Sequence, residues 1–180
     1  MHVVGFAGYS GSGKTTLVEQ LIAELRNAGL RVAVIKHAHH AFEIDHAGKD
    51  SYRHRQAGAH EVLIASSKRQ ALIREFAQPV QHNVHALIAQ LDAGTDWVLV
   101  EGFKQSDLLK LEIWRAGATD RPALYPEDDF IVAIATDSPT QLPQATQRPV
   151  LDLNHASGVA TWLQGNSARF AYQAEHYHAA

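Results

Sequence analysis

The feature that most constrains this chain is a glycine-rich loop near its N-terminus, with the sequence GYSGSGKT over residues 8–15. The apolar residues 3–7 before the loop predict a buried strand, and residues 16–22 after it have the pattern of an amphipathic helix. A glycine loop between a strand and a helix is typical of phosphate-binding loops, whereas a chance glycine-rich turn has no need of either neighbour. We therefore expect a nucleotide site here.

Each residue type in the loop has a physical role in such a site. Glycines let the backbone bend so that successive N–H groups point inward and surround a phosphate, and the helix N-terminus adds its positive end. Lys14 reaches the outer phosphates and stabilises charge that develops there, and Thr15 offers its hydroxyl to Mg²⁺. The expected nucleotide-binding residues of the loop are Gly8, Tyr9, Ser10, Gly11, Ser12, Gly13, Lys14, Thr15 and Thr16.

The composition excludes several other classes of protein. Of the 180 residues, 46% are hydrophobic, which suffices for one domain, expected over residues 1–165 with a frayed tail over 166–180. The formal charge of −3 predicts no binding of nucleic acid or of an anionic membrane, and no apolar run approaches the ~18 residues of a membrane span. The absence of cysteine excludes disulfides and thiolate metal sites. We expect a soluble cytoplasmic protein.

Apolar runs alternate with helical patterns along the chain, which predicts an α/β fold. Together with the loop, this pattern indicates a P-loop NTPase three-layer sandwich, with a mainly parallel sheet. Two runs joined by residues 66–69 predict an antiparallel hairpin that adds its strands to this sheet. The expected strands are 2–7, 31–36, 61–65, 70–76, 97–100, 111–114, 131–135 and 150–151. The expected helices are 14–28, 51–56, 80–91 and 155–163.

Two acidic residues follow buried strands of the predicted sheet. Glu101 ends the run 97–100, and because ligands gather at the carboxyl ends of parallel strands, we expect it to face Thr15 and share the Mg²⁺. Its extra methylene relative to aspartate allows contact through a metal-bound water. An ordinary acid at a strand end is the alternative.

Asp137 follows the run 131–135 and is a candidate for recognition of the base. A carboxylate there accepts hydrogen bonds from guanine N1–H and the 2-amino group, a donor pair that adenine lacks. The residues before Asp137 lack the asparagine and lysine of the usual guanine motif. A cap of the turn that begins at Ser138-Pro139 is the alternative role for this carboxylate.

A polar segment follows the second predicted strand. Asp45 and Asp50 are candidates to position the attacking water or to contact a ligand of the Mg²⁺, and Lys49 is a candidate to contact a phosphate. The histidines that offer a transition-metal site instead are His37, His39 and His40. We favour a solvated switch loop over a metal site, because neither strand nor helix spacing is assured for these histidines.

Together these stretches resemble the MobB family, the B proteins of molybdopterin-guanine dinucleotide biosynthesis. The resemblance rests on Gly8–Thr16, Lys36-His37, His40, Asp45, Gly48–Ser51, Ala57–Ala59 and Leu99–Lys104. Residues 133–137 also resemble the family's strand that ends in a small polar residue and an aspartate. The similarity runs through roughly the first 140 residues, and this combination is far more specific than a phosphate-binding loop alone.

The resemblance implies a small GTP-binding protein that hydrolyses GTP slowly with Mg²⁺. The family's proposed role is as an adapter to the molybdopterin guanylyltransferase that attaches GMP to molybdopterin. The resemblance also implies that the chain forms a homodimer. By position in the motifs, residues 8–16 hold the phosphates, Thr15 and Glu101 the Mg²⁺, and Asp137 the guanine.

Two other classes of function stay open. A small-molecule kinase also uses a GSGKTT loop, but it needs an acid after the second strand and an arginine-rich lid, where this chain has Lys36-His37 and no arginine-dense segment. A histidine-rich metallochaperone GTPase is suggested by the histidines near position 39 and by His176 and His178. Without cysteine, its site would consist of imidazole and carboxylate ligands.

Overall fold

The computed structural model describes residues 1–38 and 42–173, which fall into two compact units. The larger unit comprises residues 1–37 and the chain from residue 83 onward, and the smaller unit comprises residues 38–82. Residues 38–82, which the sequence places inside a single domain, therefore form a unit of their own. The predictions for His39, His40, His176 and His178 concern residues outside the described ones.

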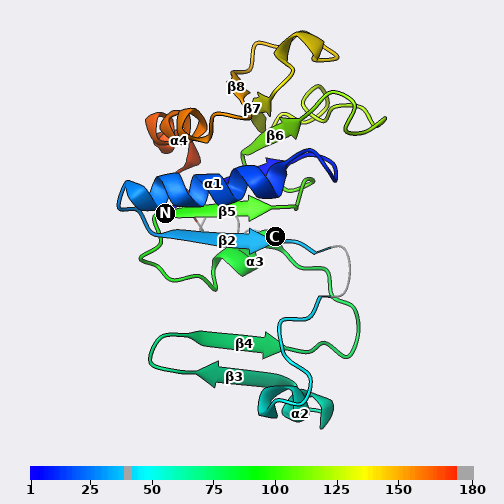
Figure 1. The fold of residues 1–180 in the computed structure, drawn as a ribbon, viewed down its shortest axis with the longest axis vertical. Helices are drawn as coiled ribbons and strands as arrows, with labels where there is room; N and C mark the ends of the chain where they lie inside the picture. The colour runs from blue at the N-terminus through cyan, green and yellow to red at the C-terminus, as the bar shows by residue number, and fades with distance from the viewer. Residues whose placement is uncertain (39–41, 174–180) are drawn as a thin grey trace. The chain divides into compact units, whose positions relative to one another are not determined.

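The larger unit is built on a six-stranded sheet in the order β2-β5-β1-β6-β7-β8 (Figure 1). All strand pairings in this sheet, within the described residues, are parallel. The strands are β1 (His2–Ala7), β2 (Val32–Lys36), β5 (Trp97–Glu101), β6 (Lys110–Trp114), β7 (Ile131–Thr136) and β8 (Val150–Asp152). The helices are α1 (Lys14–Asn27), α3 (Val84–Ile88), α4 (Ala156–Gly165) and the 3₁₀ turns η1 (Pro139–Gln141) and η2 (Ser167–Phe170).

Helices cover both faces of this sheet, because side chains alternate along each strand. Val4 and Phe6 of β1 belong to an apolar cluster with Leu17 and Leu21 of α1 and with α4. Val3 belongs to a second cluster with residues of β5 and α3. β1 and β5 carry near-continuous apolar runs, as strands buried on both faces do. The predicted α/β fold with a mainly parallel sheet is confirmed.

The smaller unit corrects one prediction about the hairpin. β3 (Glu61–Ala65) and β4 (Gln70–Arg74) pair with each other in an antiparallel, two-stranded sheet, and they do not add to the six-stranded one. The short helix α2 (Asp50–Gln56) packs on β3. Local turn chemistry predicts that two strands pair with each other, but it says nothing of a third neighbour.

Two predicted boundaries also differ from the structure. The helix expected over 80–91 is only Val84–Ile88. It begins at Val84 because the side chain of Asn83 accepts the N–H groups of His85 and Ala86 and so fixes the first turn. The tail expected to be frayed from residue 166 instead begins with η2, where Phe170 is buried against the rings of Trp97 and Trp162. Burial of an aromatic ring outweighs the entropy of a terminal segment.

Within the described part of the chain, no helix has both the length and the apolar character needed to cross a membrane.

Candidate functional site

The glycine-rich loop connects β1 to α1 at the carboxyl edge of the sheet. Gly8, Gly11 and Gly13 have φ angles of 138°, 82° and 96°, a region that side chains other than glycine rarely adopt. A Cβ at Gly8 would lie 2.5 Å from the carbonyl oxygen of Ile113, so the loop also needs glycine there to pass the end of β6. These glycines give the loop the bend that the sequence predicts for a phosphate cradle.

Lys14 is the first residue of α1, and its side chain folds back over the loop. Its Nζ donates to the carbonyl oxygen of Tyr9 at 2.7 Å and to Oγ of Ser12 at 3.5 Å. Partial burial lowers the pKa of Lys14 below that of an ordinary lysine, and the positive charges of Lys104 and Lys36 lower it further, against the opposing effect of Glu101. The surroundings of Lys14 thus disfavour its protonated form relative to a lysine in water.

Glu101 lies at the end of β5, directly opposite the start of α1. Oγ1 of Thr15 donates to Oε1 of Glu101 at 2.7 Å, and Nζ of Lys36 lies 3.5 Å from Oε2. The parallel register that pairs Phe6 with Glu101 produces this contact, since β1 leads into the loop. The structure therefore brings together the two residues that the sequence assigns to one Mg²⁺. A hydroxyl and a carboxylate are both oxygen ligands of the kind that Mg²⁺ prefers.

The chain turns sharply immediately after Glu101. Gly102 has a φ of 95°, and a Cβ there would lie 2.7 Å from Cβ of His37. Phe103 has a φ of 46°, uncommon for a bulky residue, and its ring packs on that of His37 with 4.6 Å between centroids. Unusual backbone geometry of this kind concentrates at functional sites. Here it directs the chain from Glu101 to Lys104.

Asp137 follows β7 at the same edge of the sheet. Its Oδ2 lies 2.7 Å from Nε of Arg115 in an ion pair, and its Oδ1 accepts from Oγ of Ser138 at 2.9 Å. The alternative role as a turn cap finds no support, because no side chain caps η1 and Oγ1 of Thr136 accepts the N–H of Ser138. Arg115 comes directly after β6, and sequence reasoning missed it.

Two more cations that sequence reasoning missed surround Tyr9. Nζ of Lys104 lies 5.1 Å from the centroid of the Tyr9 ring, and Cζ of Arg121 lies 5.3 Å from it. Lys104 stands in the motif that carries the family resemblance, so its presence at the site could have been inferred. Arg121 lies in a loop without a recognisable motif, and its contact depends on the fold.

Comparison with known proteins decides the family. The family model described as molybdopterin guanine dinucleotide synthesis protein B, MobB, matches residues 3–137. The chain belongs to this family. The adapter protein for molybdopterin-guanine dinucleotide biosynthesis of Escherichia coli is 38% identical over 167 residues, which span 90% of this chain and 93% of that protein. Its counterpart from Haemophilus influenzae is 42% identical over 90% of this chain and 87% of its own length.

Solved structures agree with this assignment. A MobB homologue from Bacillus stearothermophilus superposes with a TM-score of 0.67 at 26% identity, covering 94% of this chain and 99% of that one. The MobB of Bacillus subtilis gives a TM-score of 0.68 at 22% identity over 91% and 97% of the two chains, which shows the shared fold. The P-loop fold expected from the sequence is thus the fold of the family's known structures.

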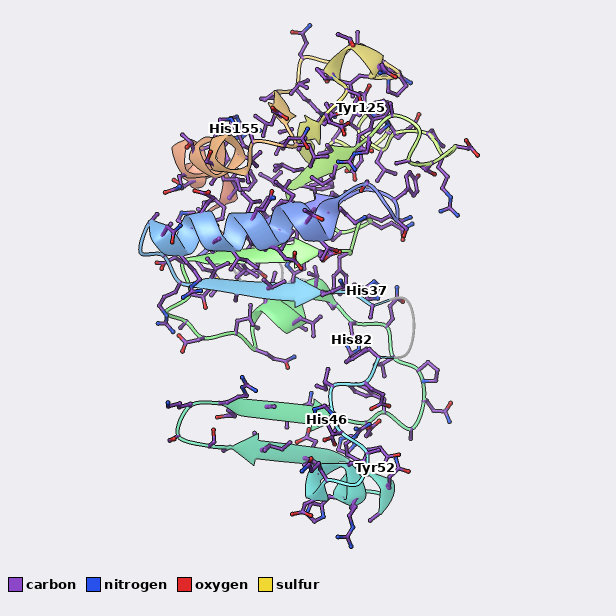
Figure 2. All side chains as sticks on the ribbon, viewed as in Figure 1. His37, His46, Tyr52, His82, Tyr125 and His155 are labelled. Atoms are coloured by element: carbon purple, nitrogen blue, oxygen red, sulfur yellow. The ribbon has the colours of Figure 1, made fainter. Side chains whose placement is uncertain are left out.

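The remaining predicted residues of this MobB-family chain lie in the smaller unit. Asp45 accepts from Oγ of Ser51 at 2.8 Å and from the N–H of His46, and it forms an ion pair with Arg55. Figure 2 labels His46 and Tyr52 in this unit. Burial alone would raise the pKa of the Asp45 carboxyl, but these hydrogen bonds and the guanidinium outweigh it, and the net effect is a lowered pKa. Asp45 thus stabilises the turn before α2.

Lys49 and Asp50 stand at the start of α2, as N-cap and first helical residue, and both are exposed. Their predicted roles toward phosphate and water stay predictions. Among the described residues, no three histidine, aspartate or glutamate side chains form a group that could hold a metal ion. The histidine-based metal hypothesis therefore gains no support from the described histidines.

A hollow of about 580 Å³ lies away from the glycine loop. Ile131 and Pro149, at the amino ends of β7 and β8, line it together with Arg148 and Arg169. Ligands of parallel sheets collect at the carboxyl edge, where the loop, Glu101 and Asp137 lie. The carboxyl edge is thus the better candidate site.

We expect Gly8→Ala to destabilise the larger unit more than Gly11→Ala does. Both glycines have positive φ, so alanine costs about 1–3 kcal/mol at either position. Only at Gly8 does the new Cβ also meet a backbone atom, the carbonyl oxygen of Ile113, whereas Gly11 faces open space. Urea unfolding followed by tryptophan fluorescence, to which the buried Trp97 contributes, compares the two free energies of unfolding. Equal losses would contradict this account of the loop.

Proposed function

We propose that this chain is a GTP-binding adapter of molybdopterin-guanine dinucleotide biosynthesis that uses Mg²⁺ and hydrolyses GTP slowly. The observation that carries the proposal is the hydrogen bond between Thr15 and Glu101, beside a loop whose glycines all have positive φ. Both curated relatives described above are named as adapter proteins of this pathway. The geometry of the loop and the names of these relatives together favour a phosphate and metal site in a protein that acts by binding a partner protein.

Slow hydrolysis is consistent with the groups at the site. Water attacks the γ-phosphate in line, and Lys14, Mg²⁺ and the N–H groups of the loop stabilise the developing charge. The carboxylate of Glu101 contacts Thr15 and Lys36, which suits a metal ligand better than a general base. Asp45 and Asp50 remain the candidates to position the water, and Lys49 the candidate for a phosphate contact. Because no strong base stands beside the loop among the residues described, the rate depends on Lys14 and the metal.

Guanine recognition by Asp137 is compatible with its contacts. Each carboxylate oxygen has two lone-pair sites, so the contacts with Arg115 and Ser138 leave acceptors for guanine N1–H and the 2-amino group. Arg115 also fixes the orientation of this exposed carboxylate, which a specific donor pair requires. The proposed base site therefore consists of Asp137 and Arg115, and the carboxylate of Asp137 recognises the guanine.

A homodimer is the assembly that we propose, and the hairpin supports it. Leu63 and Leu72 are paired across β3 and β4, and their side chains are 60% and 47% exposed. An isolated two-stranded hairpin is marginally stable in water, and an uncovered apolar pair on it favours a further protein layer. A second copy of the chain supplies such a layer. The further partner that we propose is a molybdopterin guanylyltransferase, and molybdopterin is a second candidate ligand. We propose that these interactions take place in the cytoplasm. Capture of the guanylyltransferase by the tagged chain tests the proposed partner.

Asp137→Asn is expected to abolish the preference for GTP over ATP, because an amide cannot accept both guanine donors. The loss of GTP affinity should be about tenfold, with ATP affinity nearly unchanged. Calorimetric titration of both nucleotides measures the ratio. Lys14→Ala should weaken the binding of GTP and ATP alike. Arg115→Gln removes the ion pair but keeps the carboxylate, so it should reduce the GTP preference without abolishing it. A wild-type chain that prefers ATP, or transfers its phosphate to a metabolite, would refute the proposal.

Thr15→Val should remove the dependence of GTP binding on Mg²⁺, because the variant keeps a similar shape but lacks the oxygen ligand. Thr15→Ser retains the hydroxyl and is the matched control. We expect Mg²⁺ to strengthen GTP binding about tenfold in the wild type and in Thr15→Ser, and hardly at all in Thr15→Val, in titrations with Mg²⁺ or EDTA. The purified wild type should turn GTP over slowly in the same samples. Rapid turnover by the chain alone would contradict an adapter role.

Leu63→Lys with Leu72→Lys should convert the dimer to a monomer, because two charges would then have to be buried at the interface. Sedimentation equilibrium at micromolar concentration measures the mass. Val150→Lys, at a position 41% exposed on β8 in the larger unit, is the control and should leave the mass unchanged. A wild-type chain that is already monomeric would rule out the proposed dimer.

A further inference from the structure

The ring of Tyr9 carries a pair of cations that the proposed nucleotide site does not yet use. Lys104 comes from the loop after β5 and Arg121 from the loop before β7, and both place their charge about 5 Å from the ring centroid, at 5.1 and 5.3 Å. Such distances fit cation–π contacts. Within the described residues, neither cation has a carboxylate within ion-pair distance, whereas Lys36 pairs with Glu101 and Arg115 with Asp137.

A buried lysine holds the loop that carries Lys104. The side chain of Lys110 on β6 is 1% exposed, and its Nζ donates to the carbonyl oxygens of Lys104 at 3.0 Å and of Ser106 at 2.6 Å. The same Nζ lies 2.8 Å from Oδ2 of Asp128. Burial of a lysine is costly, and these contacts with the loop and with Asp128 offset that cost. The position of Lys104 is thus fixed by the core.

A buried glutamate holds the segment that follows Arg121. Glu112, two residues after Lys110 and therefore on the same side of β6, accepts the N–H of Leu124 at 2.8 Å and that of Tyr125 at 2.6 Å. Burial raises the pKa of the Glu112 carboxyl, against the two N–H groups that lower it. Both cation-bearing loops are therefore attached to one strand through buried charged groups. This rigid attachment suits a binding site, because little ordering remains to be done when a ligand arrives.

The cations lie at the end of the loop where the outer phosphates of a nucleotide belong. Lys14 is the group that reaches those phosphates, and its Nζ contacts the backbone of Tyr9 at 2.7 Å. The charge of Lys104 is close enough to disfavour the protonated form of Lys14. Three like charges near one tyrosine repel one another, and a polyanion relieves that repulsion.

We propose that Lys104 and Arg121 bind the terminal phosphate of a nucleoside triphosphate and so make the site selective for the triphosphate over the diphosphate. This inference rests on the proposed nucleotide site. The loop N–H groups hold the inner phosphates, which both forms of the nucleotide possess. The terminal phosphate adds the charge and the acceptor oxygens that pair with a lysine and a guanidinium. Tyr9 holds the two cations in place, and Lys110 and Glu112 act as positioning residues.

The test compares the affinities for GTP and GDP, both with Mg²⁺, in Lys104→Gln, Arg121→Gln and the double variant. Each single substitution should lower the affinity for GTP about tenfold and change the affinity for GDP by no more than about twofold. The reason is that a charge-assisted hydrogen bond is lost only in the complex with the triphosphate. Arg26→Gln removes the same charge at the exposed far end of α1, well beyond the screening length, and should change neither affinity. Tyr9→Leu removes the aromatic ring and should lower the ratio of GTP affinity to GDP affinity a few-fold. Tyr9→Phe keeps the ring and should leave this ratio unchanged.

Equal weakening of GTP and GDP in the Lys104 and Arg121 variants would overturn the inference, because it would indicate only the general positive potential of the site. Unchanged affinities in both variants would overturn it as well. A wild-type chain that binds neither nucleotide would refute the nucleotide site itself, and this inference with it. Circular dichroism and thermal unfolding verify the fold of each variant. Selective loss of GTP affinity in both single variants supports the proposal.

Discussion

The parallel pairing of β1 with β5 on one side and β6 on the other is the constraint on which the candidate site depends. This register sets Phe6 beside Glu101 and Ala7 beside Glu112. β1 therefore enters the glycine loop with the strand that ends in Glu101 on one side and the strand that anchors the two cation-bearing loops on the other. Thr15, Lys104 and Arg121 reach one small region because these three strands end together.

The sequence predicts best where a local pattern determines the structure. β1, the glycine loop and α1 follow from a short apolar run, positive-φ glycines and helical spacing, and their bounds are close to those expected. The proximity of Glu101 to Thr15 is predictable as well, since a strand that ends in an acid brings it to the edge where ligands gather.

Predictions fail where distant parts of the chain decide the outcome. The hairpin is encoded locally, but whether it joins another sheet depends on tertiary pairing, and it forms a sheet of its own. Phe170 looked like part of a frayed tail because its partners, Trp97 and Trp162, are recognisable only in the folded chain. Arg115 and Arg121 were missed for the same reason, because single arginines outside any motif give no signal until the strands are ordered.

The chain leaves the larger unit directly beside Glu101. Lys36, at the end of β2, pairs with the carboxylate of Glu101, and the N–H of the next residue, His37, donates to the carbonyl oxygen of Glu101 at 2.9 Å. The smaller unit begins one residue later. Its covalent connection thus starts beside Glu101, the residue proposed to hold the metal. One ion pair and one backbone hydrogen bond thus join the proposed metal ligand to the residues that lead into the smaller unit.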